Sequence, residues 1–134
     1  MKAKYFIFVF FLAVLTGCST TRPSGSAKAD PETMQIVYHA RPGKEAELQG
    51  ALASAWQIYR AQHLVFAEPH IIIRDTEDGT KARFVEVFTW VSRAIPEHAP
   101  DAVQKVWGQE QSLCEARGGH DGIEIGEVEL ITGK

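Results

Sequence analysis

The sequence has few of the residues from which metal and redox sites are usually built. It has two cysteines, Cys18 and Cys114, and no Cys-x-x-Cys pair. Its five histidines never follow one another as His-x-His or His-x-x-x-His, and they fall on different predicted elements: His39, His63, His70, His98 and His120. Protein zinc sites usually show such spacings. The sequence therefore predicts neither a metal site nor a cofactor.

An excess of positive charge is also missing. The chain has 14 Lys and Arg against 17 Asp and Glu, which gives a net charge of −3. Lys2 and Lys4 are the only basic residues among the first 17, so a chain without them keeps 12 basic residues. A mildly acidic domain has no field that would attract nucleic acid. We therefore expect no nucleic-acid partner.

No apolar run is long enough to cross a membrane. The run Tyr5 to Leu15 (YFIFVFFLAVL) would cover about 16 Å as a helix, against about 30 Å of bilayer hydrocarbon. After Lys2 and Lys4, it is typical of a secretory signal peptide.

The four residues Leu15-Thr16-Gly17-Cys18 resemble the lipobox of bacterial lipoproteins. That resemblance implies a lipid on Cys18, which would become the mature N-terminus and tie the protein to a membrane. Ser19 resembles the signal for the outer membrane, facing the periplasm, if the source is Gram-negative. The alternative is an ordinary secretory signal with an incidental cysteine.

The remaining chain divides into a tether and a domain. Residues 19–31 (STTRPSGSAKADP) are small and polar and are expected to form a flexible tether. With residues 1–18 as the signal peptide, residues 32–134 make one domain.

Hydrophobic periodicity predicts six elements in this domain. They are a strand at 34–40, a helix at 44–63, a hairpin at 70–91, a helix at 102–117 ended by Gly118-Gly119, and a strand at 123–131. The order β-α-β-β-α-β predicts an α+β, ferredoxin-like fold, an antiparallel sheet with both helices on one face.

The hairpin contains Asp78-Gly79, which favours a two-residue type I′ turn. This turn would pair Ile71 with Glu86 and Arg74 with Arg83, at a solvated tip. One face would then carry Ile71, Ile73, Phe84, Glu86, Phe88 and Trp90. Both hairpin faces are largely apolar, so the face away from the helices is expected to pack against a second copy in a homodimer.

Three stretches carry a resemblance to a known family: Arg41 to Glu47 (RPGKEAE), Phe84 to Ser92 (FVEVFTWVS), and Glu97 to Pro100 (EHAP) leading into Val103 and Trp107. From about Met34 to Ile131, the chain resembles the antibiotic biosynthesis monooxygenase-like domains of the dimeric α/β-barrel superfamily. The resemblance implies a dimeric α/β barrel.

The superfamily includes cofactor-free oxygenases of aromatic polyketides, haem-degrading enzymes and isomerases of small lactones. Its oxygenase and haem-degrading types use an asparagine on the first strand. This sequence contains no asparagine and offers Gln35, Tyr38 and His39 there. The position of the haem ligand falls near Gln109.

Glu86 is the first candidate for catalysis. Among apolar neighbours, its carboxylate would have a raised pKa, as a general acid or base near neutral pH requires. It could instead pair with a cation across a dimer, or be exposed by sheet twist.

His98 is the second catalytic candidate, as a group that hydrogen-bonds a ligand or shuttles a proton. Its alternatives are an exposed loop position or a helix cap. Expected ligand-binding residues are Tyr38, His39, Trp90 and Trp107, and His63 and His70 could join Glu86 around the cavity. Cys114 is expected to be a buried apolar side chain, with cross-linking of two chains as the alternative.

These expectations describe a lipid-anchored envelope protein with a pocket for a small, largely apolar or aromatic molecule. The activity implied by the resemblance is a cofactor-independent monooxygenase or isomerase. The alternative is a non-catalytic binding protein or a structural protein of the envelope.

Overall fold

The computed structural model describes residues 29–131. The predicted signal peptide, Cys18 and residues 19–28 of the tether lie outside the described residues. The elements are β1 (Glu32–His39), α1 (Glu45–Ala61), β2 (Val65–Glu77), β3 (Lys81–Trp90), the 3-10 helix η1 (Pro96–His98), α2 (Asp101–Leu113) and β4 (Ile123–Glu127). Within residues 29–131, neither helix is long and apolar enough to span a bilayer.

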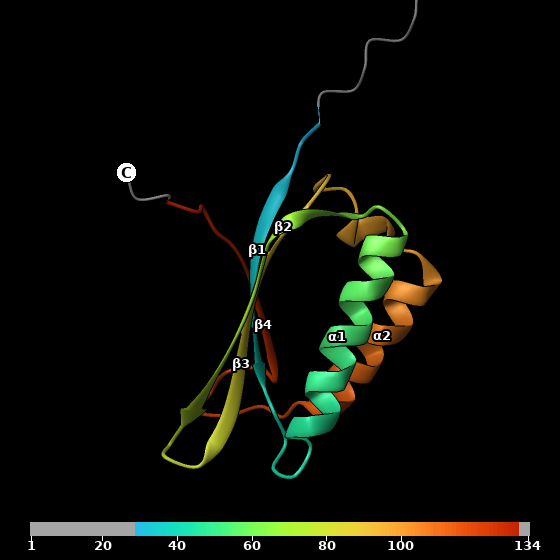
Figure 1. Cartoon of the computed structure of the whole chain (residues 1–134). Helices are drawn as coiled ribbons and strands as arrows, with labels where there is room; N and C mark the ends of the chain where they lie inside the picture. Colours follow the sequence, from blue (N-terminus) through green and yellow to red (C-terminus); the bar gives the residue numbers. More distant parts are fainter. Residues whose placement is uncertain (1–28, 132–134) are drawn as a thin grey trace, which may run out of the picture.

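The strands form one antiparallel sheet in the order β2-β3-β1-β4. Both helices lie on the same side of this sheet, and no helix of the described residues covers the opposite side (Figure 1). This arrangement confirms the predicted ferredoxin-like fold. The strands β3 and β1 are interior, whereas β2 and β4 are the edges.

Each helix turns one buried stripe toward the sheet. In α1 the stripe is apolar at three- and four-residue steps, and consists of Leu48, Ala51, Leu52, Ala55 and Tyr59. In α2 it consists of Val103, Val106, Glu110 and Leu113, so a carboxylate occupies a core position. The helix α2 ends at Leu113, four residues earlier than expected, and Cys114 continues in extended backbone. Cys114 is buried and forms no disulfide within residues 29–131.

The hairpin has a different register from the expected one. Asp78 and Gly79 both adopt positive φ, as a type I′ turn requires, but Glu77 pairs with Lys81 and the loop contains three residues. Ile72 therefore lies opposite Glu86. The predicted pairing of Ile71 with Glu86 was therefore wrong. A one-residue slip exchanges the two faces of a strand, so it also changes which residues of β2 share a face with Glu86.

The corrected register places His70, Ile72 and Arg74 on the helix-facing side with Phe84, Glu86 and Phe88. The predicted opposition of Arg74 and Arg83 was also wrong. Arg83 lies opposite Asp75, and its Nε donates a hydrogen bond of 2.9 Å to Oδ1 of that residue. The Arg74 guanidinium lies over the Phe84 ring, 5.7 Å from its centre. Arg83 and Arg74 thus each have a favourable partner.

Candidate functional site

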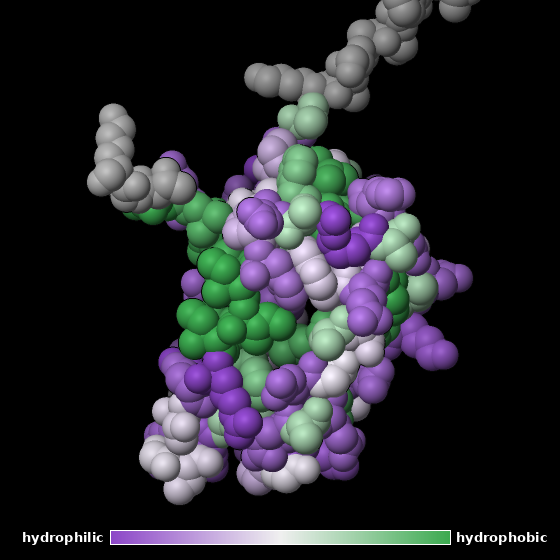
Figure 2. Space-filling view, in the orientation of Figure 1, coloured by the Kyte–Doolittle hydropathy of each residue, from purple (hydrophilic) through white to green (hydrophobic). Residues whose placement is uncertain are grey.

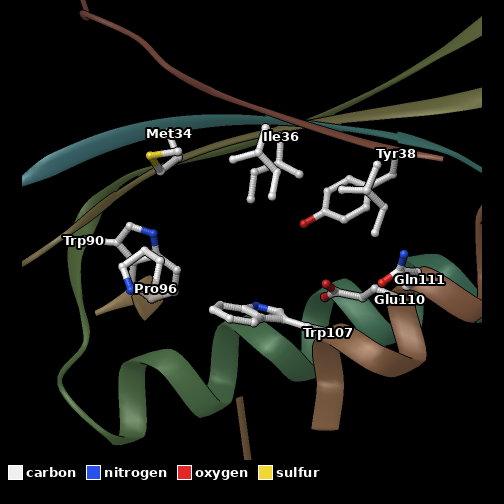
Figure 3. A pocket seen from close by; sticks show the side chains of 10 residues that line it. Met34, Ile36, Tyr38, Trp90, Pro96, Trp107, Glu110 and Gln111 are labelled. Carbon is white, nitrogen blue, oxygen red and sulfur yellow. The ribbon is translucent and has the colours of Figure 1, made fainter. Parts of the chain in front are cut away.

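A cavity of about 430 Å³ lies between the helix-facing side of the sheet and α2. Its wall is mostly apolar and aromatic, and is made by Met34, Ile36, Tyr38, Trp90, Pro96, Trp107, Glu110, Gln111, Ile123 and Ile125. Figure 3 shows the β1 side chains on one side of the space and those of α2 on the other. A continuous apolar area reaches a hollow beside the sheet (Figure 2). Ile125, which lines the cavity, is 68% exposed.

Glu110 is a buried polar group of the cavity wall. Its side chain is 2% exposed, and its buried Oε1 has no hydrogen-bond partner among the described residues. The carboxyl group points into the cavity beside Trp107, as does the hydroxyl of Tyr38 from the opposite wall (Figure 3). Burial and then the charge of Glu86 raise the pKa of Glu110 to about 8. Near neutral pH, Glu110 is therefore mostly protonated and can donate a hydrogen bond to a ligand.

Glu86 lies on β3, fully enclosed at 1% exposure, and is already hydrogen-bonded on both oxygens. The Tyr38 hydroxyl donates to Oε2 at 3.0 Å, and Nε2 of His70 lies 2.9 Å from Oε1. The His70 ring stacks on Trp56 of α1, with ring centres 3.6 Å apart and planes 7° apart. Burial, and then the charge of Glu86, raise the pKa of Tyr38 well above its usual range, so Tyr38 keeps its proton.

The aromatic wall is held in place by one short hydrogen bond. Nε1 of Trp107 donates to the Tyr59 hydroxyl at 2.6 Å. Trp90 packs edge-on against Trp107, at 6.3 Å between ring centres, and against Phe88 at 4.9 Å. Because these rings come from α1, β3 and α2, the cavity wall depends on the whole fold.

The structure brings together some of the sequence-predicted site residues and separates others. Tyr38, Trp90 and Trp107 line the cavity, and Glu86 is bonded to Tyr38 behind its wall. His98 lies in η1, is exposed, and does not line the cavity. The catalytic roles of Glu86 and His98 stay predictions.

His39 belongs to a second cluster, on the face of the sheet away from the helices. It is 2% exposed, and its two ring nitrogens each lie 2.7 Å from a carboxylate oxygen, of Glu77 and of Glu124. Arg117 donates to Glu77 at 3.0 Å, and His120 lies 2.7 Å from Glu124. Among residues 29–131, no group of His, Cys, Asp or Glu has the arrangement of a metal site.

Sequence reasoning did not select Glu110 as a functional residue. The available signal was its place in the apolar stripe of α2, three or four residues from Val106 and Leu113. An acid at such a position must be either paired or functional, because a buried carboxyl group without a partner is costly.

No family model and no curated protein sequence matches the chain. Solved structures do. SnoaB, a cofactor-independent oxygenase from Streptomyces nogalater, is 15% identical with a TM-score of 0.58, over 78% of this chain and 97% of that one. Rv0793 from Mycobacterium tuberculosis is 13% identical with a TM-score of 0.54, over 78% and 98%.

A third similar structure is that of a candidate antibiotic biosynthesis monooxygenase from Caulobacter crescentus. It is 10% identical with a TM-score of 0.53, over 78% of this chain and 92% of that one. At these identities the likeness establishes the fold alone, which is that of antibiotic biosynthesis monooxygenase-like proteins.

Proposed function

We propose that the cavity binds a small, largely apolar or aromatic molecule with a carbonyl or hydroxyl oxygen, and promotes its cofactor-independent monooxygenation or isomerisation. The observation that carries this proposal is Glu110, a buried carboxyl group whose free oxygen lies in an otherwise largely apolar cavity. Buried polar groups are almost always paired, so an unpaired one at a cavity wall fits a ligand that completes it. The structural likeness to SnoaB, a cofactor-independent oxygenase, supports the same reading.

The two buried glutamates have different roles: Glu110 donates a hydrogen bond and Glu86 accepts a proton. Glu110 holds its proton near pH 7 and donates a hydrogen bond to the ligand oxygen, which stabilises negative charge as it develops there. Glu86 receives the proton that the ligand loses, through the Tyr38 hydroxyl. A carboxyl group that donates a hydrogen bond and a second one that accepts a proton are a common arrangement for acid and base chemistry in one site.

Anthrone is a suitable test substrate, because it is a flat aromatic ketone with an acidic C–H group. Loss of that proton gives an anion that reacts with O2, and the return of one proton completes the products, anthraquinone and water. We expect the protein to accelerate oxygen uptake with anthrone, and Glu110→Gln to lower the rate about 100-fold, the effect of losing one oxyanion donor. The measurement is the initial rate of oxygen uptake above the uncatalysed rate.

The matched control is Glu47→Gln, which changes an exposed glutamate of α1 at the salt bridge with Lys44. It should leave oxygen uptake unchanged. Uptake that is equal in the wild type and in Glu110→Gln would contradict the role of Glu110. Mass spectrometry of small molecules that co-purify with the protein would identify the natural ligand class.

The second candidate function is binding without chemistry. It is favoured by Glu86, because both of its oxygens are already engaged inside the protein. Under this alternative, anthrone or a related aromatic ketone quenches Trp107 fluorescence on binding, while oxygen uptake stays at the uncatalysed rate.

The proposed assembly is a homodimer that packs sheet against sheet. The sheet face away from the helices exposes Ile71 (45%) and Ile73 (53%), and Val85 and Val87 lie beside them on β3. Apolar area of this kind on an uncovered sheet face suits a second copy of the chain. Ile73→Lys should convert the dimer to a monomer in analytical ultracentrifugation, whereas Lys81→Gln should not.

The proposed location is the bacterial envelope, by a lipid on Cys18, and the outer membrane facing the periplasm in a Gram-negative source. The support is the run Tyr5 to Leu15 followed by Leu15-Thr16-Gly17-Cys18. In the full chain, Cys18→Ser should move the protein from the membrane fraction to the soluble fraction. Unchanged fractionation would contradict lipid anchoring.

A further inference from the structure

Three hydrogen-bonding side chains cross the helix-facing side of the sheet in one line. Tyr38 on β1 lies at the cavity wall, Glu86 on β3 lies behind it, and His70 lies on β2, the edge strand. The Tyr38 hydroxyl lies 3.0 Å from Oε2 of Glu86, and Oε1 of Glu86 lies 2.9 Å from Nε2 of His70. The exposed fraction of the side chains rises from 1% at Glu86 to 21% at His70. The line therefore starts at the cavity and ends at solvent.

Each group in this line has the chemistry that a proton relay needs. The Tyr38 oxygen can accept one proton while its own passes to Glu86. A carboxylate can take a proton on one oxygen while the other stays bonded to a histidine. His70 uses Nε2 toward Glu86, and Nδ1 is then the ring nitrogen for exchange with water.

We propose that Tyr38, Glu86 and His70 form a proton relay between the cavity and solvent, with His70 as its outer end. A proton leaving the ligand goes to the Tyr38 oxygen, and the Tyr38 proton goes to Oε2 of Glu86. Oε1 of Glu86 and Nε2 of His70 share the next proton in the line, and Nδ1 of His70 releases a proton to water. The number of protons on the three groups is unchanged, and no oxidant or reductant takes part. The direction of transfer rests on the proposed function, but the relay itself is testable without a ligand.

The surroundings of His70 fix its ring for this role. Trp56 of α1 stacks on one face of the ring and holds the ring plane in which Nε2 meets Oε1 of Glu86. Three other titratable groups lie around the relay. Arg74 lies four residues further along the same face of β2, and Glu110 and Tyr59 each interact electrostatically with Glu86 and Tyr38. His70 is a positioning and exchange residue, because it does not line the cavity itself.

The first test measures how fast the Tyr38 hydroxyl exchanges its proton with water, without any ligand. In protein labelled with ¹³C at the tyrosine ζ carbon, in equal H2O and D2O, fast exchange gives one ¹³C line and slow exchange gives two. We expect His70→Phe, which keeps a ring on Trp56 but cannot carry a proton, to slow exchange about 100-fold. Glu86→Gln should do the same. His63→Asn, at an exposed histidine outside the line, is the matched control.

Equal exchange in the wild type and in His70→Phe would overturn the relay. Amide exchange along β3 must be the same in both proteins, and the Tyr59 hydroxyl serves as an internal reference, since it contacts no histidine and bonds Trp107. His70→Ala opens space beside Trp56, and added imidazole should restore fast exchange at Tyr38. Failure of imidazole to restore it would also count against the relay, because a purely structural role predicts no rescue.

The second test uses anthrone and separates the relay from the proposed function. If the wild type turns anthrone over, His70→Phe should lower kcat about 10-fold or more with little change in KM. A wild type that does not act on anthrone argues against the proposed function alone, and the hydroxyl exchange then decides the relay. Unchanged kcat in His70→Phe would overturn the relay while leaving the proposed function in place.

Discussion

The two buried clusters of this domain use the same residue types and differ in how well they are satisfied. In the His39 cluster both carboxylates face cations or ring nitrogens, and Nε of Arg117 is the one buried polar atom there without a partner. In the cavity cluster, Glu110 keeps an unpaired buried oxygen and a raised pKa. A buried hydrogen-bond network whose groups are all paired makes a fold more rigid, whereas one with unpaired groups costs stability and is typical of functional sites. The difference supports the cavity cluster, rather than the His39 cluster, as the proposed functional site.

Removing Arg117 should have the largest effect on stability. Arg117→Met removes a buried guanidinium, and leaves the partly exposed carboxylates of Glu77 and Glu115 without their cation and the buried Ala40 carbonyl oxygen without this donor. We expect the free energy of unfolding at pH 7 to fall by about 3 kcal/mol, in the range for breaking a buried ion pair. Urea unfolding measures this.

The matched control is Arg93→Met, because Arg93 also meets three carboxylates but is 49% exposed. Its loss should lower the free energy of unfolding by less than about 1 kcal/mol. Equal losses in the two variants would break the comparison, since burial would then not distinguish the His39 cluster from a surface network.

Replacing Glu110 should raise the free energy of unfolding, by an amount that depends on pH. The folded protein keeps on Glu110 a proton that the unfolded chain releases, so stability falls as pH rises from about the ordinary value of 4.5 through about 8. In Glu110→Leu, the fall in stability with rising pH is absent, and so is the unpaired oxygen. Relative to the wild type, the variant should gain about 3 kcal/mol in free energy of unfolding between pH 5 and pH 9.

Urea unfolding at both pH values checks this gain, with Glu47→Gln as the surface control that should show none. A Glu110→Leu variant that tracks the wild type at every pH would show that Glu110 is satisfied in solution. The cavity cluster would then resemble the His39 cluster.

Removing His39 should give a smaller loss with the opposite dependence on pH. Burial alone would lower the pKa of His39, but hydrogen bonds to Glu124 and Glu77 outweigh it and raise the pKa above 6.5. The stability from this pair is therefore complete below pH 6.5 and is lost as pH rises through the raised folded pKa. His39→Gln should cost about 2 kcal/mol at pH 6, in the range for hydrogen bonds to charged groups.

The cost of His39→Gln should shrink by pH 9, and thermal unfolding at several pH values measures it. His120→Gln is the control, because His120 also meets Glu124 but is 61% exposed, and its removal should change little. A cost of His39→Gln that is the same at pH 6 and pH 9 would mean that His39 carries no extra proton in the fold.

The smallest effect is expected for Tyr59→Phe, which removes the acceptor for Nε1 of Trp107. One lost neutral hydrogen bond should lower the free energy of unfolding by about 1 kcal/mol. The emission spectrum of Trp107 should also shift, because its indole N–H loses a partner. A variant with the wild-type spectrum and stability would show that packing alone holds the cavity wall.

The sequence by itself determined the order of elements and the fold class. Alternation along 84–90 and the helical stripe from Leu48 to Tyr59 are local patterns, so they predict strand and helix without knowledge of partners. The buried aromatic residues Trp90 and Phe88 followed from the same patterns. The predicted ends of elements were less accurate. The helix α2 ends early because Cys114 forms an antiparallel bridge with Ala40, which is distant in the sequence.

Only the tertiary structure decided the register and the site. A loop of three residues instead of two moved Ile72 opposite Glu86, and turn chemistry alone does not distinguish these lengths around Asp78-Gly79. That one-residue shift also brought His70 to Glu86. Glu110 became a candidate functional residue only through the cavity between α2 and β1. Whether a buried oxygen is paired depends on its three-dimensional surroundings, which no local pattern of residues contains.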